Sequence, residues 1–187
     1  MYALIATGSQ KAQHEIAEVV RSCADFEIVF ASSASEALNE AGRHPFDLCV
    51  VNGDKTGRAK AAAVKIAKLS EGGVILLEEA NEFEASVASL ARSGIVVVQK
   101  PLSKMSLVAA IRSVCAANMR LVELKEANRS LEQKLEDLKF IDRAKISLIK
   151  QFGYSEDEAH KYIEKQAMNL RVTKREVAMN ILRTYEN

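Results

Sequence analysis

Residues 46–52 read Phe-Asp-Leu-Cys-Val-Val-Asn, a nearly continuous apolar run that ends in a polar residue. Residues 74–77, Val-Ile-Leu-Leu, repeat the apolar part of this pattern. Apolar runs of this length without alternation are typical of central strands that are buried on both faces of a parallel sheet. These two stretches therefore predict a parallel sheet that is covered by helices on both faces.

The rest of the first half alternates strand-like and helix-like segments. Further strands are expected at residues 2–6, 26–30 and 95–98, and helices at residues 14–22, 35–41, 59–69 and 82–92. This alternation predicts an α/β domain with a doubly wound, five-stranded parallel sheet. In such a sheet the functional groups belong at the carboxyl ends of the strands.

Residues 1–115 resemble the receiver domain of response regulators, a flavodoxin-like fold. The resemblance rests on the order of the elements, on FDLCVV before a loop, and on VVVQKPLS at residues 96–103. It implies that Lys100 is the receiver lysine and that Pro101 follows it through a cis bond.

The other residues of the receiver phosphorylation site differ in this chain. The resemblance would place a phosphoacceptor aspartate where Asn52 stands, a hydroxyl residue where Glu78 stands, and an acidic pair within Ala6-Thr7-Gly8-Ser9. An amide cannot form an acyl phosphate, and without the acidic pair no magnesium ion would offset the incoming charge. The sequence thus predicts a pseudo-receiver that does not catalyse its own phosphorylation.

Two residues near this site have more than one interpretation. Asp54 is a candidate substitute acceptor, but residues 53–57, Gly-Asp-Lys-Thr-Gly, also have the composition of a turn. Lys100 is expected to pair with Glu78 or Glu79, or to be exposed.

Between Leu102 and Gly153 no glycine or proline interrupts the chain. The first part of this helix is expected to pack on the sheet through Leu107, Ala110, Ile111, Val114 and Cys115. Heptads follow in residues 116–140, with Leu121, Asn128 and Leu135 at a positions and Leu124, Leu131 and Leu138 at d positions. Leucine at d with one asparagine at a predicts a parallel, two-stranded coiled coil that makes the protein a dimer. The alternative is a single amphipathic helix that lies on its own receiver domain.

Residues 141–187 are expected to form a small three-helix domain. Gly153 can end the first helix at about Gln151, and capping boxes at residues 155–158 and 173–176 start helices over 156–168 and 174–184. The expected core consists of Ile141, Ala144, Leu148, Ile149, Ala159, Tyr162, Ile163, Ala167, Val177, Ala178, Ile181 and Leu182.

This segment resembles the ANTAR domain, the RNA-binding module of bacterial transcription antiterminators. The resemblance rests on Arg143-Ala144-Lys145, Leu148, Ser155 to Ala159, Gln166 to Asn169, Arg171 and Val177-Ala178. One departure is Ile146, where a glycine commonly follows the Ala-Lys pair. The resemblance implies a dimer that binds hairpins in leader transcripts and so prevents a terminator stem from forming.

The side chains that suit RNA recognition are cations for phosphates and amides for base edges. The candidate RNA-binding residues are Arg143, Lys145, Gln166, Asn169, Arg171, Thr173, Lys174 and Arg175, where Thr173 heads a helix whose N-terminal end favours a phosphate. Tyr154 and His160 are candidate stacking groups, although both also suit ordinary structural roles. Taken without the family resemblance, the basic cluster is better explained as a solvated helix end.

No Ser/His/Asp set, metal-ligand cluster or phosphate-binding loop is visible in the sequence, so we do not expect an enzyme. The 187 residues carry a net charge of +1, so nucleic-acid contacts must come from a local patch. We expect no membrane span, no cofactor and no metal, a cytoplasmic location, and three cysteines (Cys23, Cys49 and Cys115) that act as buried apolar residues. With no phosphorylation site, a sensor protein that sequesters the dimer is the expected input. DNA binding by helix–turn–helix, a protein-interaction adaptor, and a phosphorelay through Asp54 are the alternatives.

Overall fold

The computed structural model describes residues 1–185. The chain divides into two compact units, Met1–Val122 and the residues from Glu123 onward. The boundary between the units falls within one helix, α5 (Lys104–Phe152). Each unit has its own buried core, and each is described below by itself.

The first unit is built on the five-stranded parallel sheet that the sequence predicts. The strands lie in the order β2-β1-β3-β4-β5, and all neighbouring pairs are parallel. Their bounds are β1 (Tyr2–Ala6), β2 (Glu27–Ala31), β3 (Leu48–Asn52), β4 (Gly73–Glu78) and β5 (Ile95–Gln99). Every residue of β4 is buried, as expected for a strand that is covered on both faces.

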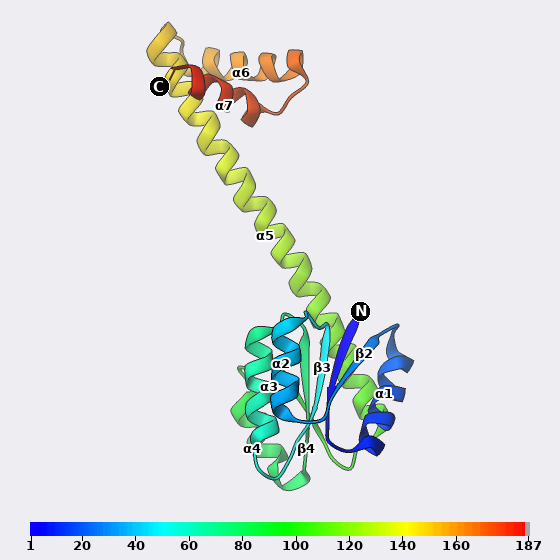
Figure 1. Ribbon diagram of the computed structural model, residues 1–187. Helices are drawn as coiled ribbons and strands as arrows, with labels where there is room; N and C mark the ends of the chain where they lie inside the picture. Colours follow the sequence, from blue (N-terminus) through cyan, green and yellow to red (C-terminus); the bar gives the residue numbers. More distant parts are fainter. Residues whose placement is uncertain (186–187) are drawn as a thin grey trace. The chain divides into compact units, whose positions relative to one another are not determined.

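Helices cover both faces of this sheet (Figure 1). The helices α1 (Gln10–Cys23) and the first part of α5 lie on one face, where Ile16, Val20 and Leu107 pack against Ile5 and Ile75. The opposite face is covered by α2 (Ala34–Arg43), α3 (Arg58–Leu69) and α4 (Ala80–Leu90). The first unit therefore has the receiver fold.

Several helix bounds differ from the sequence-based expectation by a turn or less. The helix α1 begins at Gln10 and not at His14, because the Ser9 hydroxyl accepts a hydrogen bond from the Ala12 N–H and caps the helix earlier. The helix α4 ends at Leu90, two residues before the expected end at Arg92.

Gly73, the first residue of β4, allows α5 to lie close to the sheet. A Cβ atom at this position would stand 1.7 Å from Cγ1 of Val114 on α5. No side chain fits in that space, so the glycine is required by the packing of this helix.

The helix α5 also contains an 18-residue stretch that is long and apolar enough to cross a membrane, which the sequence-based expectation missed. This is weak evidence for a membrane span, because a helix that packs on a sheet satisfies the same criterion. Leu107, Ala110, Ile111 and Val114 on this helix belong to the buried core of the first unit.

The three cysteines are free thiols, but only one of them is fully buried. Cys49 on β3 has 0% exposure, and burial raises the pKa of its thiol to about 12. Cys23 and Cys115 are partly exposed at the edge of the core, so the expectation of three buried cysteines is wrong for these two. Cys23 is the last residue of α1 and Cys115 lies on α5, and both pack against the margin of the core.

The second unit contains the end of α5 together with α6 (Glu156–Leu170) and α7 (Lys174–Tyr185). Gly153 ends α5 with a φ of 72°, a backbone conformation that suits glycine. Both predicted capping boxes are present. The Ser155 N–H donates to the Glu158 carboxylate at 2.8 Å, and the Thr173 N–H donates to Glu176 at 2.8 Å.

One buried cluster forms the core of this unit. It contains Ala144, Leu148, Ala159, Ile163, Ala167, Val177, Ala178, Ile181 and Leu182. Ile149 and Tyr162 were expected in this core, but each is 37% exposed and neither belongs to the buried cluster. Phe140, Ile141 and Tyr154 pack against the cluster from its margin.

The six heptad residues of α5 are exposed. The five leucines among them, Leu121, Leu124, Leu131, Leu135 and Leu138, have between 53% and 61% of their surface accessible, and Asn128 is also exposed. We call this set the leucine seam. Exposed leucines at regular helical spacing form an apolar stripe that a partner helix can cover.

Candidate nucleic-acid interface and receiver-like pocket

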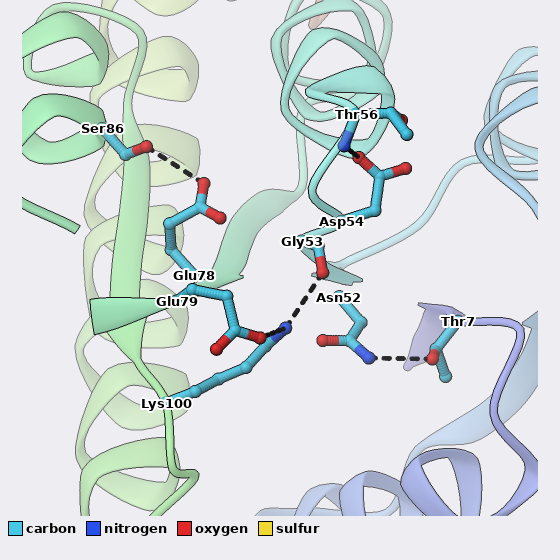
Figure 2. A network of polar contacts seen from close by, with 9 residues as sticks. All are labelled: Thr7, Asn52, Gly53, Asp54, Thr56, Glu78, Glu79, Ser86 and Lys100. Atoms are coloured by element: carbon cyan, nitrogen blue, oxygen red, sulfur yellow. Dashed lines mark hydrogen bonds and ion pairs between the residues drawn. The ribbon is translucent and has the colours of Figure 1, made fainter. Parts of the chain in front are cut away.

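At the carboxyl edge of the sheet, Asn52 occupies the end of β3. Its Nδ2 donates a hydrogen bond to Oγ1 of the buried Thr7 at 3.0 Å, which joins the ends of β3 and β1 (Figure 2). Among the described residues, its Oδ1 is the one buried side-chain oxygen or nitrogen without a hydrogen-bond partner. Asn52 thus has a structural contact at the position where a receiver would carry its phosphoacceptor.

Glu78 ends β4 and Glu79 follows it as the N-cap of α4, and the two glutamates have different partners (Figure 2). Glu78 is only 4% exposed and accepts a hydrogen bond from the Ser86 hydroxyl of α4 at 3.0 Å. Glu79 pairs with Nζ of Lys100 at 3.1 Å. The same Nζ donates to the Gly53 carbonyl at 2.9 Å, and the Lys100–Pro101 bond is cis. Of the three interpretations of Lys100, pairing with Glu79 is the observed one.

Asp54 lies in the loop between β3 and α3, where it acts as a turn and capping residue. Its Oδ1 accepts a hydrogen bond from the Thr56 N–H at 3.0 Å. Burial of this carboxyl opposes ionisation, but hydrogen bonds from Thr56, Ala59 and Arg58 outweigh it and lower the pKa of Asp54. The carboxylate is therefore occupied by backbone donors at the start of α3.

A cavity of about 280 Å³ opens between Asn52, Asp54 and the loops that follow β1 and β2. Its polar lining consists of hydroxyl groups from Thr7, Ser9, Ser32 and Ser33, the Asn52 amide and the single Asp54 carboxylate. Magnesium in protein sites is held by carboxylates together with phosphate oxygens. A set with one carboxylate, already hydrogen-bonded, does not fit the magnesium ion of a receiver.

In the second unit, the structure places most of the predicted basic residues in intramolecular ion pairs. Lys145 on α5 is 15% exposed and contacts Asp142 at 2.8 Å and Glu156 at 3.1 Å. Its hydrogen bonds to Asp142 and Glu156 raise the pKa of the Lys145 ammonium. This lysine joins α5 to the start of α6.

The basic start of α7 is held in the same way. Arg175 Nη1 lies 2.8 Å from Asp137 on α5, and its guanidinium stacks over the Phe140 ring at 5.1 Å. Lys174 forms a short ion pair with Glu164 of α6. These contacts orient α7 against the other two helices, so the two cations also have structural roles.

Thr173 takes part in the capping box of α7, where its hydroxyl donates to Glu176 at 3.0 Å. The Glu176 carboxylate therefore already occupies the helix end that was expected to meet a phosphate. Arg171 is the C-cap of α6, exposed and in the left-handed conformation with a φ of 55°. Asn169 and Arg143 are exposed, whereas Gln166 is partly buried.

Sequence reasoning missed a group of aromatic rings at the end of the bundle. Phe152 lies 5.7 Å from Tyr154 and 5.3 Å from Tyr185, and Tyr154 lies 6.0 Å from Tyr162, measured between ring centroids. Phe152, Tyr162 and Tyr185 remain exposed. The signal was the concentration of three of the four tyrosines in the last 34 residues, of which Tyr154 was a candidate stacking group and Tyr162 was assigned to the core.

The fold and these two sites define the class of the protein. Residues 129–182 match the family model of the ANTAR domain, so the C-terminal unit contains an ANTAR domain. The chain therefore combines a first unit that has the receiver fold with a C-terminal region that matches the ANTAR domain.

One relative matches almost from end to end. The transcriptional regulatory protein PdtaR of Mycobacterium tuberculosis is 27% identical over 183 residues, which cover 97% of this chain and 89% of PdtaR.

Solved structures resemble the chain at the level of fold. A response regulator receiver domain protein from Clostridium thermocellum has a TM-score of 0.56 at 16% identity, covering 64% of this chain and 98% of its own. A chain described as adenylate cyclase from Rhodopirellula baltica has a TM-score of 0.61 at 16% identity, covering 68% of this chain and 96% of its own.

Proposed function

We propose that this protein is an RNA-binding antitermination regulator that acts as a dimer on hairpins of leader transcripts. The observation that carries this proposal is the ANTAR match over residues 129–182, which spans all three helices of the C-terminal bundle. In the proposed mechanism, a bound hairpin cannot take part in the competing terminator stem.

The exposed chemistry of the bundle is compatible with RNA. Single-stranded loops are bound through cations, amides and planar groups. Arg171 and Asn169 supply the first two types close to the turn between α6 and α7. Lys145, Lys174 and Arg175 would contribute to RNA binding if each left its carboxylate partner and paired with an RNA phosphate instead.

The dimer is proposed from the leucine seam. Five leucines with more than half of their surface accessible would leave water when a second copy of α5 lies alongside. The single Asn128 at an a position favours two parallel strands, because each buried amide requires its counterpart. Two ANTAR domains would then be held close together, as a paired hairpin target requires.

Control by a partner protein, and not by aspartyl phosphorylation, completes the proposal. Asn52 bonded to Thr7, Lys100 paired with Glu79, and a cavity that lacks magnesium ligands leave no route to an acyl phosphate at Asn52. The retained fold would then serve as a docking surface for a sensor that sequesters the dimer.

Selection of RNA from a pool of hairpins with random loops tests the central claim. We expect recovery of a defined loop motif, and binding of that hairpin by the full chain should weaken in Arg171→Ala. Arg92→Ala, an exposed arginine on the first unit, is the matched control. Equal affinity for any polyanion, or equal loss in both variants, contradicts sequence-specific RNA binding by the ANTAR domain.

A further inference from the structure

A groove of about 190 Å³ runs between α6 and α7 in the ANTAR unit. Tyr162, Gln166 and Leu170 line it from α6, and Asn180, Thr184 and Tyr185 line it from α7. Val177 and Ile181 form its buried floor. No charged side chain of the described chain lines this groove, in contrast to the neighbouring basic cluster.

The aromatic end of the groove carries exposed ring surface. Tyr185 meets Phe152 edge to face, with an interplanar angle of 90°, and Tyr162 lies tilted beside Tyr154. These contacts hold the rings without covering them, because Tyr162 and Tyr185 keep 37% and 38% of their surface accessible. Rings that are held in place lose little conformational freedom when a ligand stacks on them.

The lining has the chemistry of a nucleobase site. Aromatic rings offer stacking faces, and the two amides and the hydroxyls offer both donors and acceptors for a base edge. A phosphate requires cations or free N–H groups, which this lining does not contain. Exposed basic residues are instead the direct neighbours of lining residues on the same helices: Lys165 precedes Gln166, and Arg183 precedes Thr184.

The acid one turn before Tyr162 does not oppose an RNA ligand strongly. Glu158 is bound in the capping box by the N–H and the hydroxyl of Ser155, each at 2.8 Å. The Glu158 carboxylate therefore lies at the start of α6, beside Ser155.

We propose that the groove between α6 and α7 receives one unpaired base of the RNA loop, stacked on Tyr162 or Tyr185 with its edge on Gln166 and Asn180. This rests on the proposed function, to which it adds a ligand class and a recognition surface outside the basic cluster. Phosphates on either side of that base would be met by Lys165 and Arg183.

The test uses the full chain and the hairpin recovered by selection, with 2-aminopurine placed at each loop position in turn. The chain has no tryptophan and four tyrosines. Tyr162 and Tyr185 line the groove and Tyr154 contacts Tyr162, so Tyr2→Phe leaves tyrosine emission from this end of the bundle. We expect the emission to fall on binding, and the 2-aminopurine emission to be quenched at one loop position.

Tyr162→Leu or Tyr185→Leu, whichever removes the stacking ring, should weaken hairpin binding by about tenfold, since a stacked base contributes roughly that factor. The matched controls are Tyr162→Phe and Tyr185→Phe, which keep the ring and should bind within about threefold. Thermal unfolding identifies any leucine variant that has lost its fold. In that case Gln166→Leu and Asn180→Leu are tested instead. These two variants should lose the preference of the protein for one base at the bound loop position.

The outcomes separate the two proposals. Unchanged affinity and no quenching in folded leucine variants overturn the base site while RNA binding by the domain stands. Failure of the unmodified chain to bind any hairpin overturns both. If sedimentation shows that the leucine variants have a different oligomeric state but an unchanged RNA affinity, the groove is a contact between copies of the chain. That result contradicts the base site.

Discussion

At the carboxyl edge of the sheet, polar side chains of the first unit bond to one another: Asn52 to Thr7, Lys100 to Glu79, and Glu78 to Ser86. In the ANTAR unit the polar and aromatic groups of the α6–α7 groove instead face an open space. A fold can persist after its phosphorylation site has been replaced by structural contacts, because the stability of a large core does not depend on that site. A small bundle with little core keeps its exposed groups available for a ligand.

The two units also differ in their cores. Buried residues cover both faces of the sheet in the first unit, whereas one cluster of nine buried residues supports the bundle. Small domains bury a smaller fraction of their surface and are correspondingly less stable. We therefore expect equal changes in the two cores to have unequal consequences.

Leu148→Ala should have the largest effect, because it removes a fully buried side chain from the smaller core. We expect a loss of about 2–5 kcal/mol in unfolding free energy, enough to open the ANTAR unit. Leu76→Ala is the matched change in the sheet, at a similar cost, and should leave the first unit folded. Hydrogen exchange measured by mass spectrometry distinguishes the two variants. Equal protection of the mutated unit in both variants would contradict the expected difference in stability.

Leu131→Lys combined with Leu138→Lys tests the leucine seam, where each lysine would place a charge in the dimer contact. We expect a monomer in sedimentation and RNA affinity that is about 100-fold lower, since the second binding event is no longer intramolecular. Ser130→Lys adds one charge on the outward side of α5 and is the control. A monomeric unmodified chain that binds hairpins equally well contradicts the paired arrangement.

Acid should destabilise the ANTAR unit. The hydrogen bonds from the backbone and hydroxyl of Ser155 and Thr173 lower the pKa values of Glu158 and Glu176 in the folded state. A lowered pKa means that this stabilisation is present above the unfolded value, about 4.3, and is lost as the pH falls through the folded value.

Circular dichroism melts at pH 6 and pH 3.5 should therefore show a small decrease in the melting temperature of the bundle. The double variant Ser155→Ala with Thr173→Ala should show less of this decrease. An unchanged pH dependence in the double variant would assign the acid effect to other carboxylates.

The Asn52→Asp substitution is expected to have no effect on phosphorylation, which makes it the smallest of the expected effects. Asn52→Asp restores a carboxylate at the end of β3, but the loop after β1 still lacks the acidic pair that would hold magnesium. Incubation with acetyl phosphate and magnesium should leave the intact mass of this variant unchanged. The unmodified chain should behave identically, and a labile adduct that disappears in Asp54→Asn would identify Asp54 as a working acceptor.

Much of the fold was predictable from particular residues. The apolar runs at 46–52 and 74–77 predicted the central strands, Gly153 predicted the end of α5, and Ser155 and Thr173 predicted the starts of α6 and α7. These signals are local, because a cap, a turn or a strand pattern is written in neighbouring residues. The exposure of Tyr162 was not predictable in this way, since both faces of α6 carry apolar residues.

The candidate sites were predictable in residue type but not in contacts. Sequence alone determined that the acceptor position holds Asn52, that α5 carries a leucine heptad, and that the last helices resemble an ANTAR domain. The pairing of Lys145, Lys174 and Arg175 with acids of other helices, and the uncharged groove between α6 and α7, emerged only from the tertiary structure. The physical reason is distance: ion pairs and grooves join residues from different helices, and their spacing exists only after the chain has folded.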